Sequence, residues 1–87
     1  MTTADLIRER LGKLQPVSLE IKDESGKHIG HAGARDGGGH YQLTIVSAAF
    51  AGASRLNRHR MIYDALGDLM RREIHALAID AFAPDEL

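Results

Sequence analysis

The five histidines are the residues of this 87-residue chain best suited to chemistry, because the chain contains no cysteine. Imidazole nitrogens bind metal ions and exchange protons near neutral pH. The lack of cysteine excludes disulfides, catalytic thiols and metal sites built only from thiolates. Any metal site must therefore use imidazole or carboxylate ligands, or take thiolate ligands from another molecule.

The histidines fall in three kinds of sequence context. His28 and His31 are separated by two residues in a glycine-rich stretch, where they are either solvated loop residues or a weak candidate for a zinc or other metal site. His75 opens the last apolar stretch, which favours a buried or half-buried imidazole bonded to a backbone carbonyl. His40 begins an alternating segment and His59 lies in a helical one, and packing or hydrogen bonding is the expected role of both.

Basic residues crowd the start of the same helical segment. Arg55, Arg58 and Arg60, with His59 between them, would form an electropositive surface for nucleic acid or an acidic partner. Positive charge at a helix N-terminus is unfavourable for the helix dipole, which calls for a compensating group. The alternative is a solvated face whose charge is balanced by nearby carboxylates: Asp64, Asp68 and Glu73.

Nothing in the sequence demands catalysis or a known nucleic-acid clamp. Ser47 and Ser54 lie where a strand end and a helix cap explain them, so we expect a binding protein and no enzyme. The GXXG turn of KH domains is missing from the segment 49–52, and the only GXXG string, at 30–33, lies in the predicted loop.

The elements that must position these residues follow from the hydrophobic pattern. Thr2 caps a helix of about three turns that ends before Pro16. A strand alternates over 17–23, a long loop spans about 24–39, and a second strand over about 40–46 returns antiparallel to the first.

A second helix and a last strand complete the pattern. Ser54 caps a long helix that reaches Arg72. Its apolar stripe comprises Leu56, Ile62, Leu66, Leu69 and Met70. A strand over 74–82 then lies parallel to its neighbour by the right-handed crossover rule, and 83–87 form a short tail that frays. We therefore expect one α/β (α+β) domain over 1–87, with a three-stranded mixed sheet and helices on one face.

Composition and charge restrict the setting. With 11 basic and 12 acidic residues, bulk charge gives no attraction to nucleic acid. No apolar run is long enough to cross a membrane and the first residues lack a signal-peptide pattern, so we expect a cytoplasmic protein.

Several strings resemble the BolA family, in the order in which the family has them. They are 23–25 (Asp-Glu-Ser), 40–41 (His-Tyr), 45–47 (Ile-Val-Ser), Phe50 with Gly52, 56–63 (Leu-Asn-Arg-His-Arg-Met-Ile-Tyr) and 74–79 (Ile-His-Ala-Leu-Ala-Ile). The Arg-His-Arg and Ile-His-Ala-Leu runs make the resemblance specific, and it covers nearly the whole chain.

This resemblance implies a class II KH-like fold and a partnership with monothiol glutaredoxin, often through a shared [2Fe-2S] cluster. The family's C-terminal ligand corresponds to His75, and its loop ligand to His28, with His31 in reserve. An alternative that the resemblance implies is a DNA-binding transcriptional regulator of stress response and morphology.

Two imidazoles cannot complete a [2Fe-2S] centre, which needs two ligands on each iron. The resemblance implies that the glutaredoxin cysteine and a glutathione thiol supply the rest. We therefore expect the chain to be a monomer without a cluster when alone and to bind the cluster in a heterodimer.

Overall fold

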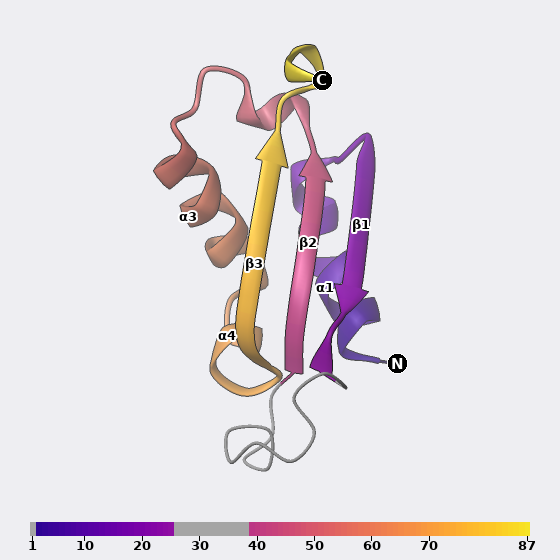
Figure 1. The fold of residues 1–87 in the computed structure, drawn as a ribbon. Helices are drawn as coiled ribbons and strands as arrows, with labels where there is room; N and C mark the ends of the chain where they lie inside the picture. Colours follow the sequence, from indigo (N-terminus) through magenta and orange to yellow (C-terminus); the bar gives the residue numbers. More distant parts are fainter. Residues whose placement is uncertain (1, 26–38) are drawn as a thin grey trace.

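The computed structural model describes residues 2–25 and 39–87. Its main elements are α1 (Thr3–Leu11), β1 (Ser18–Asp23), β2 (Gly39–Val46), α3 (Arg55–Leu66), α4 (Leu69–Arg72) and β3 (Ile74–Phe82). Short 3-10 helices at Gly12–Leu14, Ala48–Phe50 and Pro84–Glu86 join or follow them. The predicted order of helix, strand, strand, helix and strand is confirmed (Figure 1).

The strands form one mixed sheet in the order β1-β2-β3. β1 pairs antiparallel with β2, from Ser18 opposite Val46 to Asp23 opposite Tyr41. β2 pairs parallel with β3, and α3 and α4 make the connection between them. The predicted hairpin and crossover are both confirmed. Because β2 and β3 are parallel, they begin at the same end of the sheet, the lower end in Figure 1.

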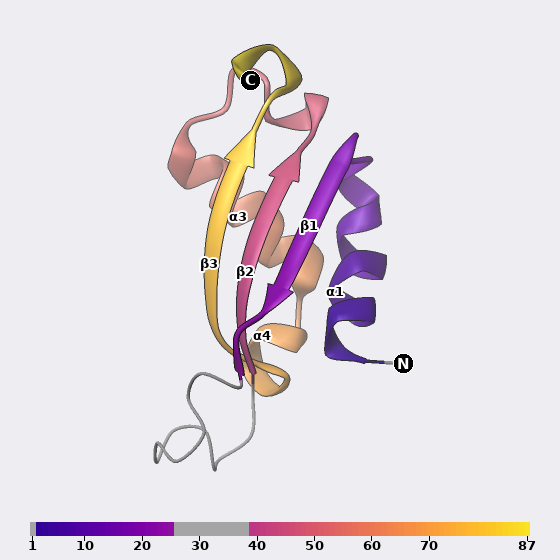
Figure 2. The ribbon, with the colours of Figure 1, turned by 45° about the vertical axis from the view of Figure 1, so that its right-hand side comes forward.

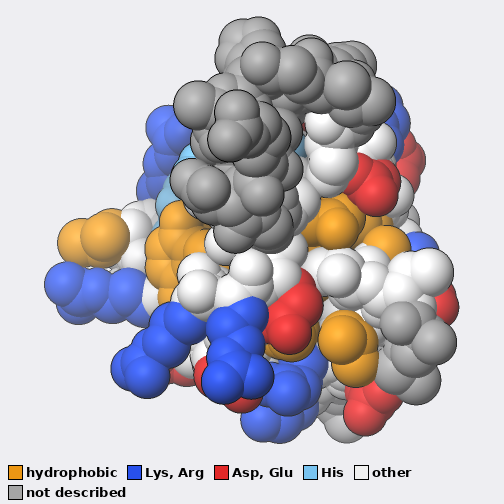
Figure 3. Space-filling view, turned by 90° about the horizontal axis from the view of Figure 1, so that it is seen from below, with side chains coloured by type: hydrophobic (Ala, Val, Ile, Leu, Met, Phe, Trp, Pro, Cys, Tyr) orange, Lys and Arg blue, Asp and Glu red, His pale blue; other side chains and the backbone are white. Residues whose placement is uncertain are grey.

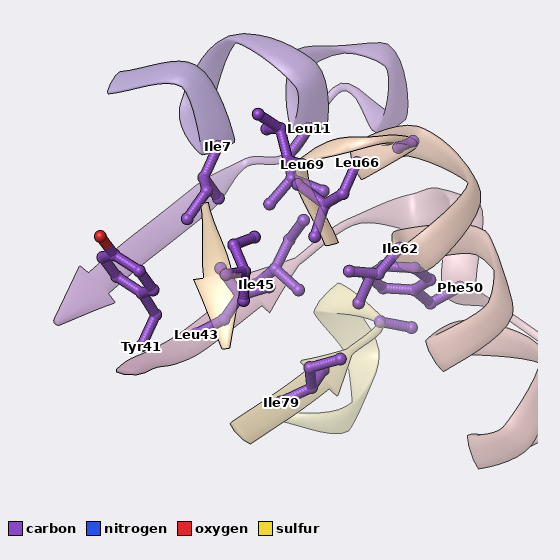
Figure 4. Packing of buried hydrophobic residues seen from close by; sticks show 13 residues of the cluster. Ile7, Leu11, Tyr41, Leu43, Ile45, Phe50, Ile62, Leu66, Leu69 and Ile79 are labelled. Carbon is purple, nitrogen blue, oxygen red and sulfur yellow. The ribbon is translucent and has the colours of Figure 1, made fainter. Parts of the chain in front are cut away.

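The helices cover one face of the sheet, as predicted (Figure 2). Buried residues from α1, α3, α4, β2 and β3 meet between the layers (Figure 4). Phe50, Leu43, Ile45 and Ile62 are fully buried in this core. Burial of such side chains stabilises a domain by about 1.5–3 kcal/mol each before the entropic cost of folding is counted.

The first helix has the predicted start. The Thr2 side chain accepts a hydrogen bond from the Asp5 backbone, and the Asp5 carboxylate accepts one from the Thr2 backbone, which is a capping box. These bonds lower the pKa of Asp5. Ile7 and Leu11 of this helix are fully buried, which anchors α1 on the sheet.

The second helix is not continuous, which corrects the prediction of one long helix to Arg72. Gly67 has φ +57°, a backbone conformation that non-glycine residues rarely adopt, and it separates α3 from α4. The apolar stripe is also incomplete. Ile62, Leu66 and Leu69 are buried as expected, but Leu56 is 60% exposed.

Two smaller expectations also need correction. Val17 precedes β1 and is 70% exposed, so the buried alternation of the first strand begins at Leu19. The tail has regular structure up to Glu86. Ala83 is fully buried, Pro84–Glu86 form a 3-10 helix, and the Glu86 carboxylate accepts a hydrogen bond from the Ala83 N–H.

Candidate functional site

The candidate ligand His75 lies one residue into β3, at an irregularity in the sheet. Gly39 of β2 pairs with Ile74, but the next residue, His40, pairs with Ala76. One step along β2 therefore corresponds to two steps along β3, and His75 is the extra residue. Such bulges redirect side chains and occur often near functional sites.

This register shift changes which way the His75 side chain faces. After the shift along β3, Leu77 and Ile79 pack toward the helices, so regular alternation would turn His75 toward the core as well. Before the shift, it is Ile74 that takes the buried position, at 3% exposure. His75 is exposed, so the expectation of a buried or half-buried imidazole is wrong.

His40 lies next to His75, which the sequence interpretation missed. The centroids of the two imidazole rings are 5.1 Å apart and the rings are tilted by 47°. The arrangement follows from the topology, because both residues stand near the start of strands that run in parallel. The signal was present in the predicted parallel pairing of two strands that each open with a histidine.

Backbone hydrogen bonds hold this end of the sheet together. The Ser25 hydroxyl accepts from the His40 N–H at 2.9 Å, and the His40 carbonyl accepts from the Glu24 N–H at 2.7 Å. The Gly39 N–H donates to the Glu73 carbonyl at 2.8 Å. Ser25 and Gly39 are therefore both held at the end of the sheet where His40 and His75 lie. Figure 3 looks onto this end and shows small parts of histidine side chains, with Lys and Arg side chains on the same face.

The predicted loop ligands, His28 and His31, lie outside the described residues. Their roles as ligand and reserve stay predictions, as does the minor zinc alternative. Within the ranges 2–25 and 39–87, no three histidine, aspartate or glutamate side chains gather into a metal-binding group. A [2Fe-2S] centre needs two ligands on each iron, so a cluster held by His75 would have to take further ligands from elsewhere.

The basic residues at the start of α3 have two different roles. Arg58 is an internal residue, with a side chain only 12% exposed. Its guanidinium donates to both Glu86 oxygens at 2.6 Å and to the backbone carbonyls of Ala53 and Ala81. Glu86 is thus the group that compensates the positive helix start.

The Arg58–Glu86 pair also shifts the pKa values of both side chains. Hydrogen bonds from Arg58 lower the pKa of Glu86 to about 2, and those to Glu86 raise the pKa of Arg58. Arg55 and Arg60 remain exposed, and His59 is half-buried. The predicted basic surface therefore consists of Arg55, Arg60 and His59, without the charge of Arg58.

A groove of about 600 Å³ lies beside this pair, between the start of α3 and the last residues of β3. Arg55, His59, Ile79 and Ala81 are among the residues that line it. It is at the opposite end of β3 from His75. Among the described residues, no helix is long and apolar enough to cross a membrane.

Comparison with known proteins agrees with this geometry. The family described as BolA-like protein matches residues 11–86. The chain is 49% identical over 87 residues to SufE-like protein 1, chloroplastic/mitochondrial, of Arabidopsis thaliana; the match covers 93% of this chain and only 24% of that relative's length. It is 40% identical over 86 residues to the DNA-binding transcriptional regulator BolA of Escherichia coli (strain K12), covering 93% of this chain and 79% of the relative.

A solved structure shows the same fold. BolA1 from Arabidopsis thaliana superimposes with a TM-score of 0.84 at 34% identity, and the match covers 100% of this chain and 98% of that one. The names of these relatives include both organellar proteins and a bacterial regulator, so the expected cytoplasmic location stays a prediction. The family match, the identities and the shared mixed sheet together show that the chain belongs to the BolA-like protein family.

Proposed function

We propose that this protein is a partner of a monothiol glutaredoxin in iron–sulfur cluster trafficking or iron sensing. In this proposal His75 and one loop histidine, His28 with His31 in reserve, are ligands of a [2Fe-2S] cluster. The glutaredoxin cysteine and a glutathione thiol complete the ligand set. When bound, the cluster would supply an iron–sulfur unit for transfer or for redox and iron sensing.

The observation that carries the proposal is the exposure of His75 at the register shift. A histidine at the start of a strand usually packs or bonds to backbone, whereas this one is turned away from the core and presented at the end of the sheet. An exposed imidazole at a rigid strand start suits a ligand shared with a second protein, since the scaffold holds its direction.

The chain connectivity brings the loop histidines within reach. Ser25 is bonded to His40, beside His75. His28 follows Ser25 by three positions in the chain, and three residues of extended chain span at most about 10 Å. His31 is six residues from Ser25, so either histidine can be supplied to the same end of the sheet.

Charge near His75 favours the proposed partners. Arg71 and Arg72 end α4 with exposed side chains, just before β3 begins. Glutathione carries carboxylate groups, and exposed guanidinium groups pair with carboxylates.

Reconstitution with and without the partner tests the proposal. The chain is mixed with a monothiol glutaredoxin, glutathione, iron and sulfide, and the visible circular dichroism of the complex is recorded. His75→Ala should change or abolish the cluster signal, while His59→Ala, on α3, should leave it unchanged. An unchanged spectrum for His75→Ala, or a stable cluster on the chain alone, would contradict the proposal.

Three further variants assign the second imidazole. His28→Ala and His31→Ala separate the predicted loop ligand from its reserve. His40→Ala tests the ring neighbour of His75, which the structure brings to the same place. We expect the largest spectral change among these three for His28→Ala.

DNA binding is the second candidate, because one relative is named as a DNA-binding transcriptional regulator. Arg55 and Arg60 are exposed on α3 and could contact phosphate. Titration of labelled duplex DNA at several salt concentrations separates the two outcomes. Specific affinity that persists at physiological salt would support this candidate, and weak binding that salt abolishes would remove it.

A further inference from the structure

The free edge of β3 differs from the free edge of β1. On β1, the exposed charged side chains of Glu20 and Lys22 form an ion pair at 3.5 Å, and Arg8 donates to the Leu19 carbonyl. Charged and capped edges discourage pairing with another strand. On β3, the exposed side chains between His75 and Asp80 are the short Ala76 and Ala78, and Asp80 accepts a hydrogen bond from Gln42 of the neighbouring strand. β3 is therefore the less protected edge of the sheet.

The direction of the backbone groups of β3 follows from one hydrogen bond. The Ser47 N–H donates to the Phe82 carbonyl at 2.9 Å, so Phe82 turns its polar groups toward the β2 side. Backbone groups alternate sides along a strand, and those of Ile79 and Ala81 therefore point outward. The bond from Arg58 Nη1 to the Ala81 carbonyl, at 3.1 Å, agrees with this direction.

The outward groups of this edge open onto the groove beside α3. Ile79 and Ala81 line the groove together with Arg55 and His59 of the helix. The Ala81 carbonyl already accepts a hydrogen bond from Arg58. Within the described parts of the chain, no hydrogen bond is found for the Ile79 N–H, the Ile79 carbonyl or the Ala81 N–H. The groove thus offers two donors and one acceptor along one strand edge.

The charges around the groove are divided between its two walls. Glu86 is paired with Arg58. On the strand wall, Asp80 accepts a hydrogen bond at 3.1 Å from the Gln42 amide, which carries no charge to offset the carboxylate. Arg55 is exposed on the helical wall and His59 lies one turn further on. The free charge that a ligand meets on this wall is positive.

We propose that this groove binds an extended, acidic peptide segment of a partner protein, which pairs with the outer edge of β3 as a fourth strand while its carboxylates contact Arg55 and His59. A strand edge flanked by a helix is a known geometry for peptide addition to a sheet. This site is independent of the cluster site at the other end of β3, and it stands or falls separately from the glutaredoxin proposal.

The backbone chemistry favours a peptide over a nucleic acid. A peptide strand presents N–H donors and carbonyl acceptors in alternation and can satisfy all three outward groups. A phosphodiester backbone presents acceptors only, so it would leave the Ile79 carbonyl without a donor from the ligand backbone. The groove also lacks the aromatic side chains on which single-stranded bases stack, apart from Phe82.

Nuclear magnetic resonance titration with synthetic peptides tests the proposal. The probe is an acetylated, amidated heptapeptide, Thr-Val-Glu-Val-Glu-Val-Thr, and two matched peptides control for its chemistry. One carries Lys in place of both Glu residues, and the other carries N-methyl groups on alternate residues, which removes its pairing donors. We expect the acidic probe to shift the amide resonances of Ile79 and Ala81 and to give cross-strand contacts to β3, and both control peptides to bind more weakly.

Two charge reversals on the same helix sharpen the test. Arg55→Glu should weaken binding of the acidic probe about fivefold, the size expected for loss of a solvent-exposed charge pair. Arg60→Glu, an equally exposed residue that does not line the groove, should leave the affinity unchanged. His75→Ala should also have no effect, which separates this site from the cluster site.

Four outcomes would overturn the proposal. The first is no shift of the β3 amides at millimolar acidic probe, and the second is equal binding of the N-methylated peptide. The third is stronger shifts of the same amides by an oligonucleotide than by the peptide. The fourth is a concentration-dependent dimer that pairs β3 with β3 of a second copy, which would assign the edge to self-association.

Discussion

At its first residues β3 carries an exposed imidazole beside a register shift, whereas at its last residues the same strand is held by several internal contacts. There, Ala83 is fully buried and the guanidinium of Arg58 links α3 to Ala81 and Glu86. The two ends belong to one strand and share one core. The difference indicates that one end stabilises the fold while the other presents an exposed imidazole that the fold does not need.

A pair of alanine substitutions tests this division most strongly. Phe50, in the short helix that follows β2, is fully buried, so Phe50→Ala should lower the free energy of unfolding by about 3–5 kcal/mol. His75→Ala removes an exposed side chain and should change the free energy of unfolding by no more than about 0.5 kcal/mol. Urea denaturation of both variants measures the difference. A large loss of stability for His75→Ala would show that His75 is structural after all.

The internal role of Arg58 gives the next largest effect. Arg58→Ala removes the donor for two backbone carbonyls and for Glu86, and should lower Tm by several degrees. Arg60→Ala, on the same helix but exposed, is the matched control and should leave Tm nearly unchanged. Equal thermal shifts for the two variants would contradict the assignment of Arg58 to the fold.

The same contact predicts an acid dependence of stability. The pKa of Glu86 is lowered from its ordinary 4.5 to about 2, so its contribution is complete above pH 4.5 and is lost as the pH falls through about 2. Glu86→Gln removes this titration. The stability difference between the natural chain and Glu86→Gln should therefore shrink on acidification over that window, as measured by urea denaturation at stepped pH. A difference that stays constant with pH would exclude the pairing.

The smallest effect is expected at the end of the sheet that carries His75. Ser25→Ala removes the acceptor of the His40 N–H and should cost about 1 kcal/mol at most. The loss should be local, because Ser25 lies outside the strands and the pairing of β1 with β2 is kept. Amide hydrogen exchange should accelerate at His40 and remain unchanged at Ile45 in the core. Faster exchange across the whole sheet would show that the two ends unfold together.

The order and pairing of the elements could be predicted because each depends on a local pattern. The Thr2 and Ser54 caps and the alternation of Leu43 with Ile45 are visible in the sequence, and chirality then determines the crossover. The break in the second helix was missed because the apolar pattern continues across Gly67. Only the positive φ of that glycine shows that the helix ends there.

The candidate site could be predicted only in part. The resemblance to the BolA family pointed to His75, but the residues alone indicated a buried or half-buried imidazole, because His75 lies beside Ile74 at the start of an apolar stretch. The register shift depends on how two distant segments pair, and no local pattern encodes it. The role of Arg58 was missed for a similar reason, since its partner Glu86 lies 28 residues away in the chain.

The register shift at His75 has a consequence for how this protein can change over evolutionary time. The direction of the side chain depends on the number of residues between Glu73 and Ala76 as much as on the residue at position 75. Deletion of one residue there would restore regular pairing and leave no place for an outward imidazole. Relatives that use this imidazole as the proposed ligand should therefore tolerate substitutions around it more readily than changes in length, and a length change in this short segment would mark descendants that have lost the outward imidazole.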